Sequence, residues 1–285
     1  MNTYTGIYIF ELAMYRLLIF AILYFPLLSF SQNGVNLFYT ASNSALSNSD
    51  ISSKRIESGS INPASMVNGN GMYVSIGAQR SFLIEDINQG NFIFNYRFKN
   101  HHAAGFQMYF YGNQVYSEAI SSLAYAVPLK DNTSIGLKLH GIRFSSPEND
   151  PSYAYTFTVG AKTMINSQLG IGMSSFNPLG FFREEKSNDL ASEFMLGISY
   201  YPSDYLGLFV SGTLNDAHPF NFSAGIAYNI KQKLNIYFSA MANPGVIGLG
   251  IGIPLGRKFG VDIAGNQHLQ LGMSPAFSFS YRELK

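Results

Sequence analysis

The chain has 285 residues, a formal net charge of +1, and a composition in which 47% of the residues are hydrophobic and only 12% are charged. Soluble domains carry about 25% charged residues, so this composition argues against an ordinary water-soluble domain. The small net charge, without any basic run, excludes the electrostatic footprint of a nucleic-acid-binding protein. Because the chain has no Cys, it can form neither a disulfide framework nor a cysteine-based zinc site.

Residues 1–31 have the features of a secretory signal peptide. Arg16 precedes an apolar run from Leu17 to Leu28, and small and polar residues follow up to Gln32. The run is shorter than the roughly 20 apolar residues that a membrane helix needs. We predict a true start at Met14, cleavage before Gln32 and export of the remaining chain. No later segment is apolar for long enough to predict a transmembrane helix.

Residues 32–71 form a segment rich in Ser and Asn that shows no sustained hydrophobic alternation. We predict that this segment precedes the folded wall of the protein, either as a disordered leader or as a hatch that plugs a lumen. It contains Asn62-Pro63-Ala64. The proline fixes its own φ and biases Asn62 toward an extended conformation, which on the residues alone indicates a turn.

From residue 72 to the C-terminus, apolar residues recur at every second position. In one such segment Phe92, Phe94, Tyr96 and Phe98 alternate with polar residues, which is the pattern of a half-buried β-strand. Short turns separate segments of roughly ten residues, the length that a tilted strand needs to cross a membrane. We predict an antiparallel meander of fourteen strands, with twelve as the alternative count. The predicted strands are 72–82, 89–98, 101–112, 115–128, 132–145, 151–163, 166–176, 190–201, 204–214, 219–229, 232–242, 244–254, 257–266 and 269–281.

The few charged residues of these strands indicate which face is turned outward. They lie on the parity opposite to the large apolar side chains. If the apolar parity faced inward, the outer surface would consist mostly of Gly, Ser, Asn and Ala, which is a poor surface for water. We therefore predict an all-β, transmembrane, up-and-down barrel whose apolar face contacts lipid and whose charges pair inside the lumen. The predicted lumen-facing charges are Arg97, Glu118, Lys138, Lys162, Glu193 and Asp262.

Sequence motifs for catalysis or metal binding are absent. The five histidines, which are His101, His102, His140, His218 and His268, have no metal-ligand spacing beyond the adjacent His101-His102, which we interpret as solvated turn residues. The glycines of Gly248-x-Gly250-x-Gly252 lie within a predicted strand, so a lumen-facing role is favoured over a phosphate loop. No G-x-S-x-G motif occurs. Glu118, Glu193 and Asp262 are conceivable acid–base groups, but ion pairs with the lumen cations explain them better. We predict no enzymatic activity, no cofactor and no metal.

The order of several motifs resembles that of a known family. The motifs are Asn62-Pro63-Ala64, the segment Leu169–Pro178 that ends in Asn-Pro, Ala242-Asn243-Pro244, Val261-Asp262, and His268 followed by Gly272 and Pro275. This chain resembles the FadL-like outer-membrane barrels, which include PorV and PorQ of the type IX secretion system. The resemblance covers nearly all of the chain after the signal peptide. The chain differs from the family in its short length, its small loops and its C-terminal residues Arg282–Lys285, where the family ends in an aromatic residue.

The resemblance implies an N-terminal hatch at residues 32–71, a barrel at residues 72–285 and a location in the outer membrane. A PorV- or PorQ-type protein would be a non-enzymatic accessory of type IX secretion or surface attachment, whose partner is a larger translocon or attachment protein. The alternative is a FadL-like transporter of hydrophobic molecules such as long-chain fatty acids, against which the short loops count. A second alternative is a barrel-like periplasmic plug of a secretion pore, against which the outward apolar parity counts.

Overall fold

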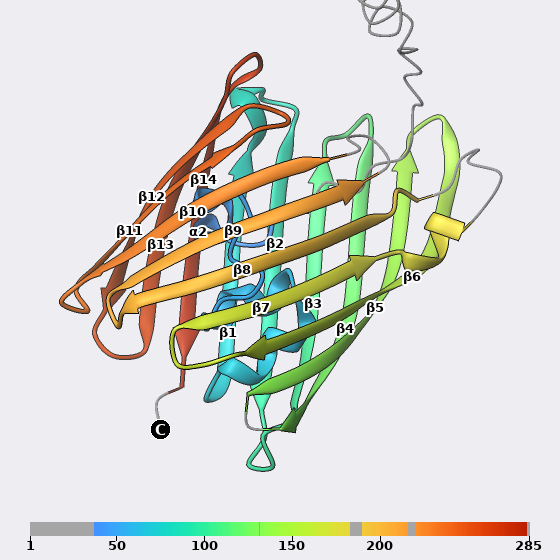
Figure 1. Cartoon of the computed structure of the whole chain (residues 1–285). Coiled ribbons are helices and arrows are strands. Elements are labelled where there is room, and N and C mark those ends of the chain that lie inside the picture. Colours follow the sequence, from blue (N-terminus) through green and yellow to red (C-terminus); the bar gives the residue numbers. More distant parts are fainter. Residues whose placement is uncertain (1–36, 131, 183–189, 216–219, 284–285) are drawn as a thin grey trace, which may run out of the picture. The chain divides into compact units, whose positions relative to one another are not determined.

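The computed structural model of the protein describes residues 37–130, 132–182, 190–215 and 220–283. The predicted signal peptide and cleavage site, and His218, lie outside these residues. Fourteen antiparallel strands form a closed barrel in which each strand pairs with its neighbours in sequence and β14 closes on β1 (Figure 1). The predicted count of fourteen is confirmed, and the alternative of twelve is wrong.

The strands are β1 (Gly71–Arg80), β2 (Asn88–Arg97), β3 (Ala103–Gly112), β4 (Ser117–Lys130), β5 (Thr133–Ser146), β6 (Asn149–Met164), β7 (Leu169–Phe176), β8 (Glu193–Ser203), β9 (Leu206–Asn215), β10 (Asn221–Ile230), β11 (Leu234–Met241), β12 (Val246–Leu255), β13 (Phe259–His268) and β14 (Gly272–Arg282). Two short helices, η3 (Ser81–Leu83) and η4 (Pro178–Phe182), follow β1 and β7. The terminal end of the barrel is defined here as the end where β1 begins and β14 finishes, and the other end is the far end.

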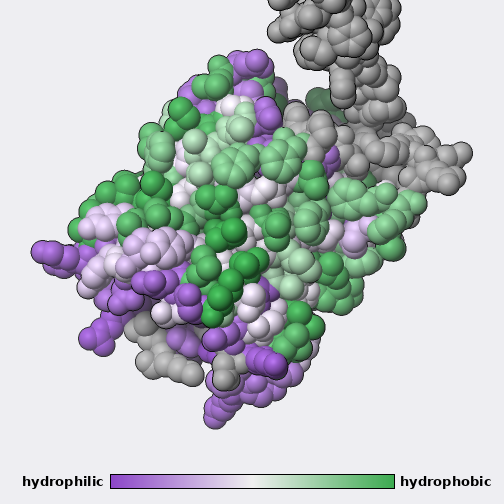
Figure 2. Space-filling view, viewed as in Figure 1, coloured by the Kyte–Doolittle hydropathy of each residue, from purple (hydrophilic) through white to green (hydrophobic). Residues whose placement is uncertain are grey.

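The alternation of side chains follows the predicted parity. Large apolar side chains point outward, such as Ile198 and Leu249, which are 47% and 57% exposed. Their neighbours, such as Ser199 in β8, are buried in the lumen. Figure 2 shows hydrophobic residues spread over the strands and hydrophilic residues gathered toward the turns. Since a closed barrel with an apolar outer face leaves no backbone group unpaired in lipid, this is the architecture of a transmembrane barrel.

In the described part of the chain, no helix has the length and the apolar character needed to cross a bilayer.

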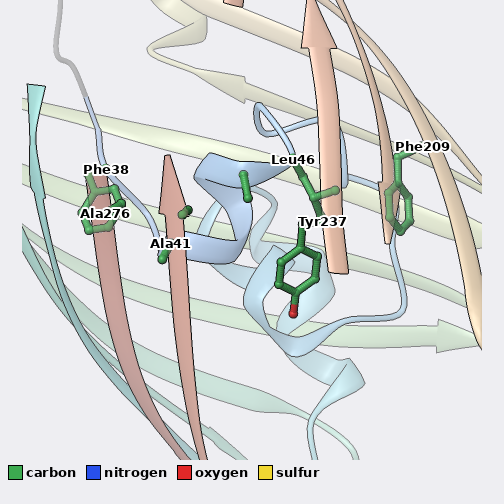
Figure 3. Close-up of a cluster of buried hydrophobic side chains, with 8 residues drawn as sticks. Phe38, Ala41, Leu46, Phe209, Tyr237 and Ala276 are labelled. Atoms are coloured by element: carbon green, nitrogen blue, oxygen red, sulfur yellow. The ribbon is translucent and has the colours of Figure 1, made fainter. Parts of the chain in front are cut away.

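Residues 37–70, called the plug from here on, fold inside the lumen (Figure 1). They contain α2 (Ala41–Ala45), η1 (Ile56–Ser60) and η2 (Pro63–Asn68). The largest buried cluster joins plug residues such as Phe38 and Leu46 to wall residues such as Phe209 and Tyr237 (Figure 3). The core therefore lies between the plug and the wall. The alternative of a disordered leader is wrong for these residues, whereas the hatch boundaries at residues 32 and 71 stay predictions.

Glycines in the wall make room for the plug. Gly136 in β5 and Gly160 in β6 lie opposite each other, and both face Pro63. A Cβ atom at Gly136 would lie 2.5 Å from the carbonyl carbon of Pro63, and one at Gly248 would lie 2.5 Å from the carbonyl oxygen of Ala45. Any larger residue at these positions would collide with plug backbone.

We expect Ile198→Arg and Leu249→Arg each to destabilise the barrel by about 2–4 kcal/mol, because an arginine side chain would be placed in the apolar band. The free energy of folding into phospholipid bilayers, measured by urea titration, checks this. The matched control is Val115→Arg, which replaces a 71% exposed apolar residue in the turn between β3 and β4. An equal loss in all three variants would contradict the assignment of the lipid-facing band.

Candidate functional site

Two cavities flank the plug. The larger, of about 880 Å³, lies at the terminal end, where Lys54 and Arg55 of the plug face Tyr201, Tyr237 and Arg282 of the wall. The smaller, of about 250 Å³, lies at the far end, where it is lined by Phe38 and Ser44 of the plug and by wall residues such as Gln79, Asn266 and Ser274. Since the plug occupies the lumen between them, it is the element that separates the two ends of the barrel.

At the larger cavity, one carboxylate of the plug pairs with two guanidinium groups. Glu57 lies between Arg55, the N-cap residue of η1, and Arg282 at the end of β14. Its Oε2 atom is 3.6 Å from Arg55 Nε, and its Oε1 atom is in close contact with Arg282 Nη2. Burial alone would raise the pKa of Glu57, but the charges of Arg282 and Arg55 outweigh this and hold the pKa below its usual value. The Arg55 guanidinium also lies over the Tyr237 ring, 4.7 Å from its centroid. This ion cluster ties the plug to the last strand.

A second plug carboxylate, Asp50, is fully buried. It accepts hydrogen bonds from Asn43 Nδ2, at 3.1 and 3.2 Å, and from Ser58 Oγ, at 3.2 Å. Burial raises the pKa of Asp50, and the nearby Arg55 charge opposes this rise. Asp50 therefore links α2 to η1 within the plug and fixes its internal fold.

The predicted lumen lysines hold the plug by its backbone. Lys138 is 2% exposed and donates to the Ser60 carbonyl oxygen at 2.6 Å and to Gln107 Oε1 at 2.7 Å. Lys162 is 5% exposed and donates to the carbonyl oxygen of Ser53. A buried ammonium group needs partners for its protons, and plug carbonyls supply them.

The other four predicted charges also have neutral partners. The partners are the Gly69 carbonyl oxygen for Arg97, Tyr116 for Glu118, Asn215 for Glu193 and Tyr237 for Asp262. Within the described part of the chain, none of the six predicted charges pairs with another of the six. The predicted ion pairs among them are wrong. Even on the paired strands β4 and β5, Glu118 and Lys138 lie six register positions apart, so that each meets a plug or near-neighbour group first.

The hatch motif Asn62-Pro63-Ala64 begins η2 and lies against β5 and β6. Asn62 is fully buried, and its Oδ1 accepts from Ala64 N at 3.0 Å, which caps the helix. Its Nδ2 donates to the carbonyl oxygens of Ile51 at 3.3 Å and of Ala161 at 3.1 Å. The Asn62 side chain therefore links two segments of the plug and also links the plug to β6. The motif is a buried contact and not a surface turn.

The C-terminal motif lies at the far end, in the hairpin between β13 and β14. His268 Nδ1 accepts from the backbone N–H groups of Gln270 and Leu271, both at 3.1 Å. Gly272 has φ +100°, which other residues rarely adopt, and Pro275 pairs with Gly265 across the hairpin. The geometry favours a structural role in shaping this turn.

The cluster of Arg55, Glu57 and Arg282 and the buried Asp50 were not predicted from the sequence. A signal was present, since three of these residues are isolated charges within a segment that is otherwise dominated by Ser and Asn. The pairing with Arg282, however, joins residues 225 positions apart. It depends on the closure of β14 on β1, which the local pattern does not encode.

We expect Asn62→Ala to lower the free energy of unfolding by about 1–3 kcal/mol, because it leaves a buried N–H and two carbonyl groups without their partner. Urea-induced unfolding in detergent micelles measures the difference. Asn70→Ala, at an exposed residue just after η2, is the matched control. Equal stabilities of the two variants would contradict the role given to Asn62.

We expect Glu57→Gln to loosen the plug by about 1–3 kcal/mol, since two partly buried guanidinium groups lose their carboxylate. Hydrogen exchange of residues 55–60, followed by mass spectrometry, should become faster. Asp204→Asn removes an exposed carboxylate at the same cavity and should leave the exchange unchanged. Faster exchange in both variants, or in neither, would refute the ion cluster as a tie.

Neither a protein-family model nor a curated protein sequence matches the chain. Several solved structures share its fold. A FadL homologue of Pseudomonas aeruginosa has a TM-score of 0.63 at 10% identity, over 87% of this chain and 99% of that one. The Pseudomonas putida toluene transporter TodX has a TM-score of 0.60 at 8% identity, over 88% and 98%. The Ralstonia pickettii toluene transporter TbuX has a TM-score of 0.58 at 10% identity, over 78% and 92%. These similarities show that the chain has the fold of FadL-like barrels.

Proposed function

We propose that the protein is a non-enzymatic channel of the outer membrane that passes hydrophobic small molecules, with the plug as its gate. The observation that carries the proposal is a plug that separates two cavities and that no disulfide ties to the wall. Support comes from the fold, because the similar structures include transporters of toluene and a channel for monoaromatic hydrocarbons. An exported, membrane-inserted barrel, preceded by a signal peptide at residues 1–31, is part of the proposal.

The contacts of the plug are suited to a gate that moves. Besides the Glu57 cluster, the two buried lysines and the apolar core, the wall holds the plug through neutral hydrogen bonds such as Ala41 N to Ser278 Oγ at 2.7 Å and Ser199 Oγ to the Ser52 carbonyl oxygen at 3.1 Å. Each such bond contributes only about 0.5–1.5 kcal/mol net, and water can replace either partner. A displaced plug would join the two cavities into one passage.

The lining of the far-end cavity fits a largely apolar ligand with a small polar group, and the lining of the terminal-end cavity combines aromatic and charged side chains. At the far end, Leu37, Phe38 and Phe82 lie beside Gln89 and Asn266. At the terminal end, Phe209 and five tyrosines lie beside the Arg55 cluster. Pockets that combine apolar walls with a few polar groups are typical of small-molecule sites.

The type IX accessory role, with a translocon or attachment protein as partner, stays a prediction from the PorV/PorQ resemblance. No feature of the described structure favours it over a channel, and the similar structures named above are transporters or their homologues. It therefore ranks second.

A disulfide between plug and wall tests the gate. Ser47 Oγ in the plug and Ser239 Oγ in β11 are 2.8 Å apart, so Ser47→Cys/Ser239→Cys should cross-link under oxidising conditions. We expect uptake of a fluorescent long-chain fatty acid, or of toluene, into proteoliposomes to fall to the level of protein-free vesicles, and to return after reduction.

The matched control joins two wall strands and leaves the plug free. Ser211 Oγ in β9 and Ser223 Oγ in β10 are also 2.8 Å apart, so Ser211→Cys/Ser223→Cys adds a similar cross-link within the barrel. Its uptake should equal that of the unchanged protein in both redox states. Undiminished uptake through the oxidised Ser47/Ser239 variant would refute the plug as gate, and no uptake by the unchanged protein would refute the channel.

A further inference from the structure

The two ends of the barrel carry opposite charge. At the terminal end, six exposed basic residues, called the basic ring, lie at or beside the hairpin turns. They are Lys99, Lys130, Lys231, Lys233, Arg257 and Lys258. The described acidic residues exposed at this end are Asp204 and Glu283. None of the six ring residues forms an ion pair with an acidic residue that the structure describes.

The far end has the reverse balance among the residues that the structure describes. Glu85 and Asp86 follow η3, and Glu148 and Asp150 lie at the turn between β5 and β6. All four are exposed, and the exposed basic residues there are Arg80 and Arg143. The basic ring is therefore a property of one end and is not a consequence of the net charge of the whole chain, which is +1.

The basic ring lies beside a belt of exposed tyrosines on the outer face of the barrel. The belt consists of Tyr96, Tyr125, Tyr200, Tyr205 and Tyr228, which are between 37% and 51% exposed. Tyrosines in membrane barrels gather at the depth of the lipid headgroups. Flexible Lys and Arg side chains just beyond such a belt can reach the phosphate groups at that depth.

The distribution of the ring favours lipid over a docked protein. Its residues belong to four hairpins, which are β2–β3, β4–β5, β10–β11 and β12–β13. In the closed strand order these hairpins form one arc that runs from β10 through the β14–β1 junction to β5, and the hairpins β6–β7 and β8–β9 carry no ring residue. The arc follows ten of the fourteen strands, and a surface that extends around most of the circumference fits a surrounding lipid leaflet better than a protein docked at one side.

We propose that the terminal end is a binding surface for anionic phospholipid, in which the basic ring holds the phosphate headgroups of the leaflet around it. This inference goes beyond the channel function, since it concerns the lipid that surrounds the barrel and the end that faces it. The acidic far end would repel the same headgroups, so the ring also orients the barrel in an asymmetric membrane.

Native mass spectrometry of the full chain in detergent, titrated with phosphatidylglycerol or with phosphatidylcholine of the same acyl chains, tests the proposal. We expect the unchanged protein to retain phosphatidylglycerol preferentially. Lys233→Gln/Lys258→Gln should weaken its apparent affinity about thirtyfold, as expected from two lost cation contacts with an anionic surface, and added salt should weaken it further.

The matched control is Arg80→Gln/Arg143→Gln, which removes the same charge from the far end and should retain phosphatidylglycerol like the unchanged protein. Equal retention of the two lipids by the unchanged protein would overturn the proposal, and so would equal losses in both double variants. Stronger retention of lipid A than of phosphatidylglycerol by the same ring residues would overturn the assignment to phospholipid. Because no readout depends on transport, failure here is distinguishable from failure of the channel function.

Discussion

The close approach of the plug to the barrel wall is the constraint on which the rest of the structure depends. A fourteen-stranded barrel encloses more space than its own inward side chains fill, and here the plug takes that space. It can do so because the wall presents glycines such as Gly136, Gly160 and Gly248 where the plug backbone passes. Without side chains at these points, main-chain atoms of plug and wall come within packing distance, and the core forms between them. Glycine within a strand usually weakens it, but here the wall glycines are the positions where the plug backbone packs against the wall.

Many of the contacts that hold the plug are polar, because most large apolar side chains of the strands point outward toward lipid. The outward parity carries the large hydrophobic residues, so the lumen receives Ser, Asn, Gln and the few charges. Within the lumen, Lys138 and Lys162 donate to plug carbonyls, and Asn62 bonds to both plug and wall. Among the residues that the structure describes, only the Glu57 cluster joins opposite charges across the boundary between plug and wall. A gate needs a closed state that is stable and yet separable by a few kcal/mol, and the neutral hydrogen bonds of the plug are contacts that water can replace.

The outer surface adds a second level of organisation. The apolar band and the tyrosine belt fix the depth of the barrel in a bilayer, while the opposite charges of its ends distinguish one leaflet from the other. A channel for hydrophobic molecules would need both a fixed depth in the bilayer and a fixed orientation across it. Its ligand crosses between two environments, and its orientation decides which cavity faces which side.

The sequence by itself determined the wall of this protein. Period-two alternation, as in Phe92 to Phe98, predicts strands because successive side chains point to opposite faces, and the parity of Lys138 and Asp262 predicts which face is the lumen. The local pattern also indicates the plug segment, through its lack of alternation and its Asn62-Pro63-Ala64 turn. Only the tertiary structure decided what the lumen charges bind. Lys138 meets Ser60, and Arg282 meets Glu57, because the barrel closes around a segment folded inside it. Such partners lie far apart in the chain, and no local periodicity specifies the path of an irregular segment through an enclosed space.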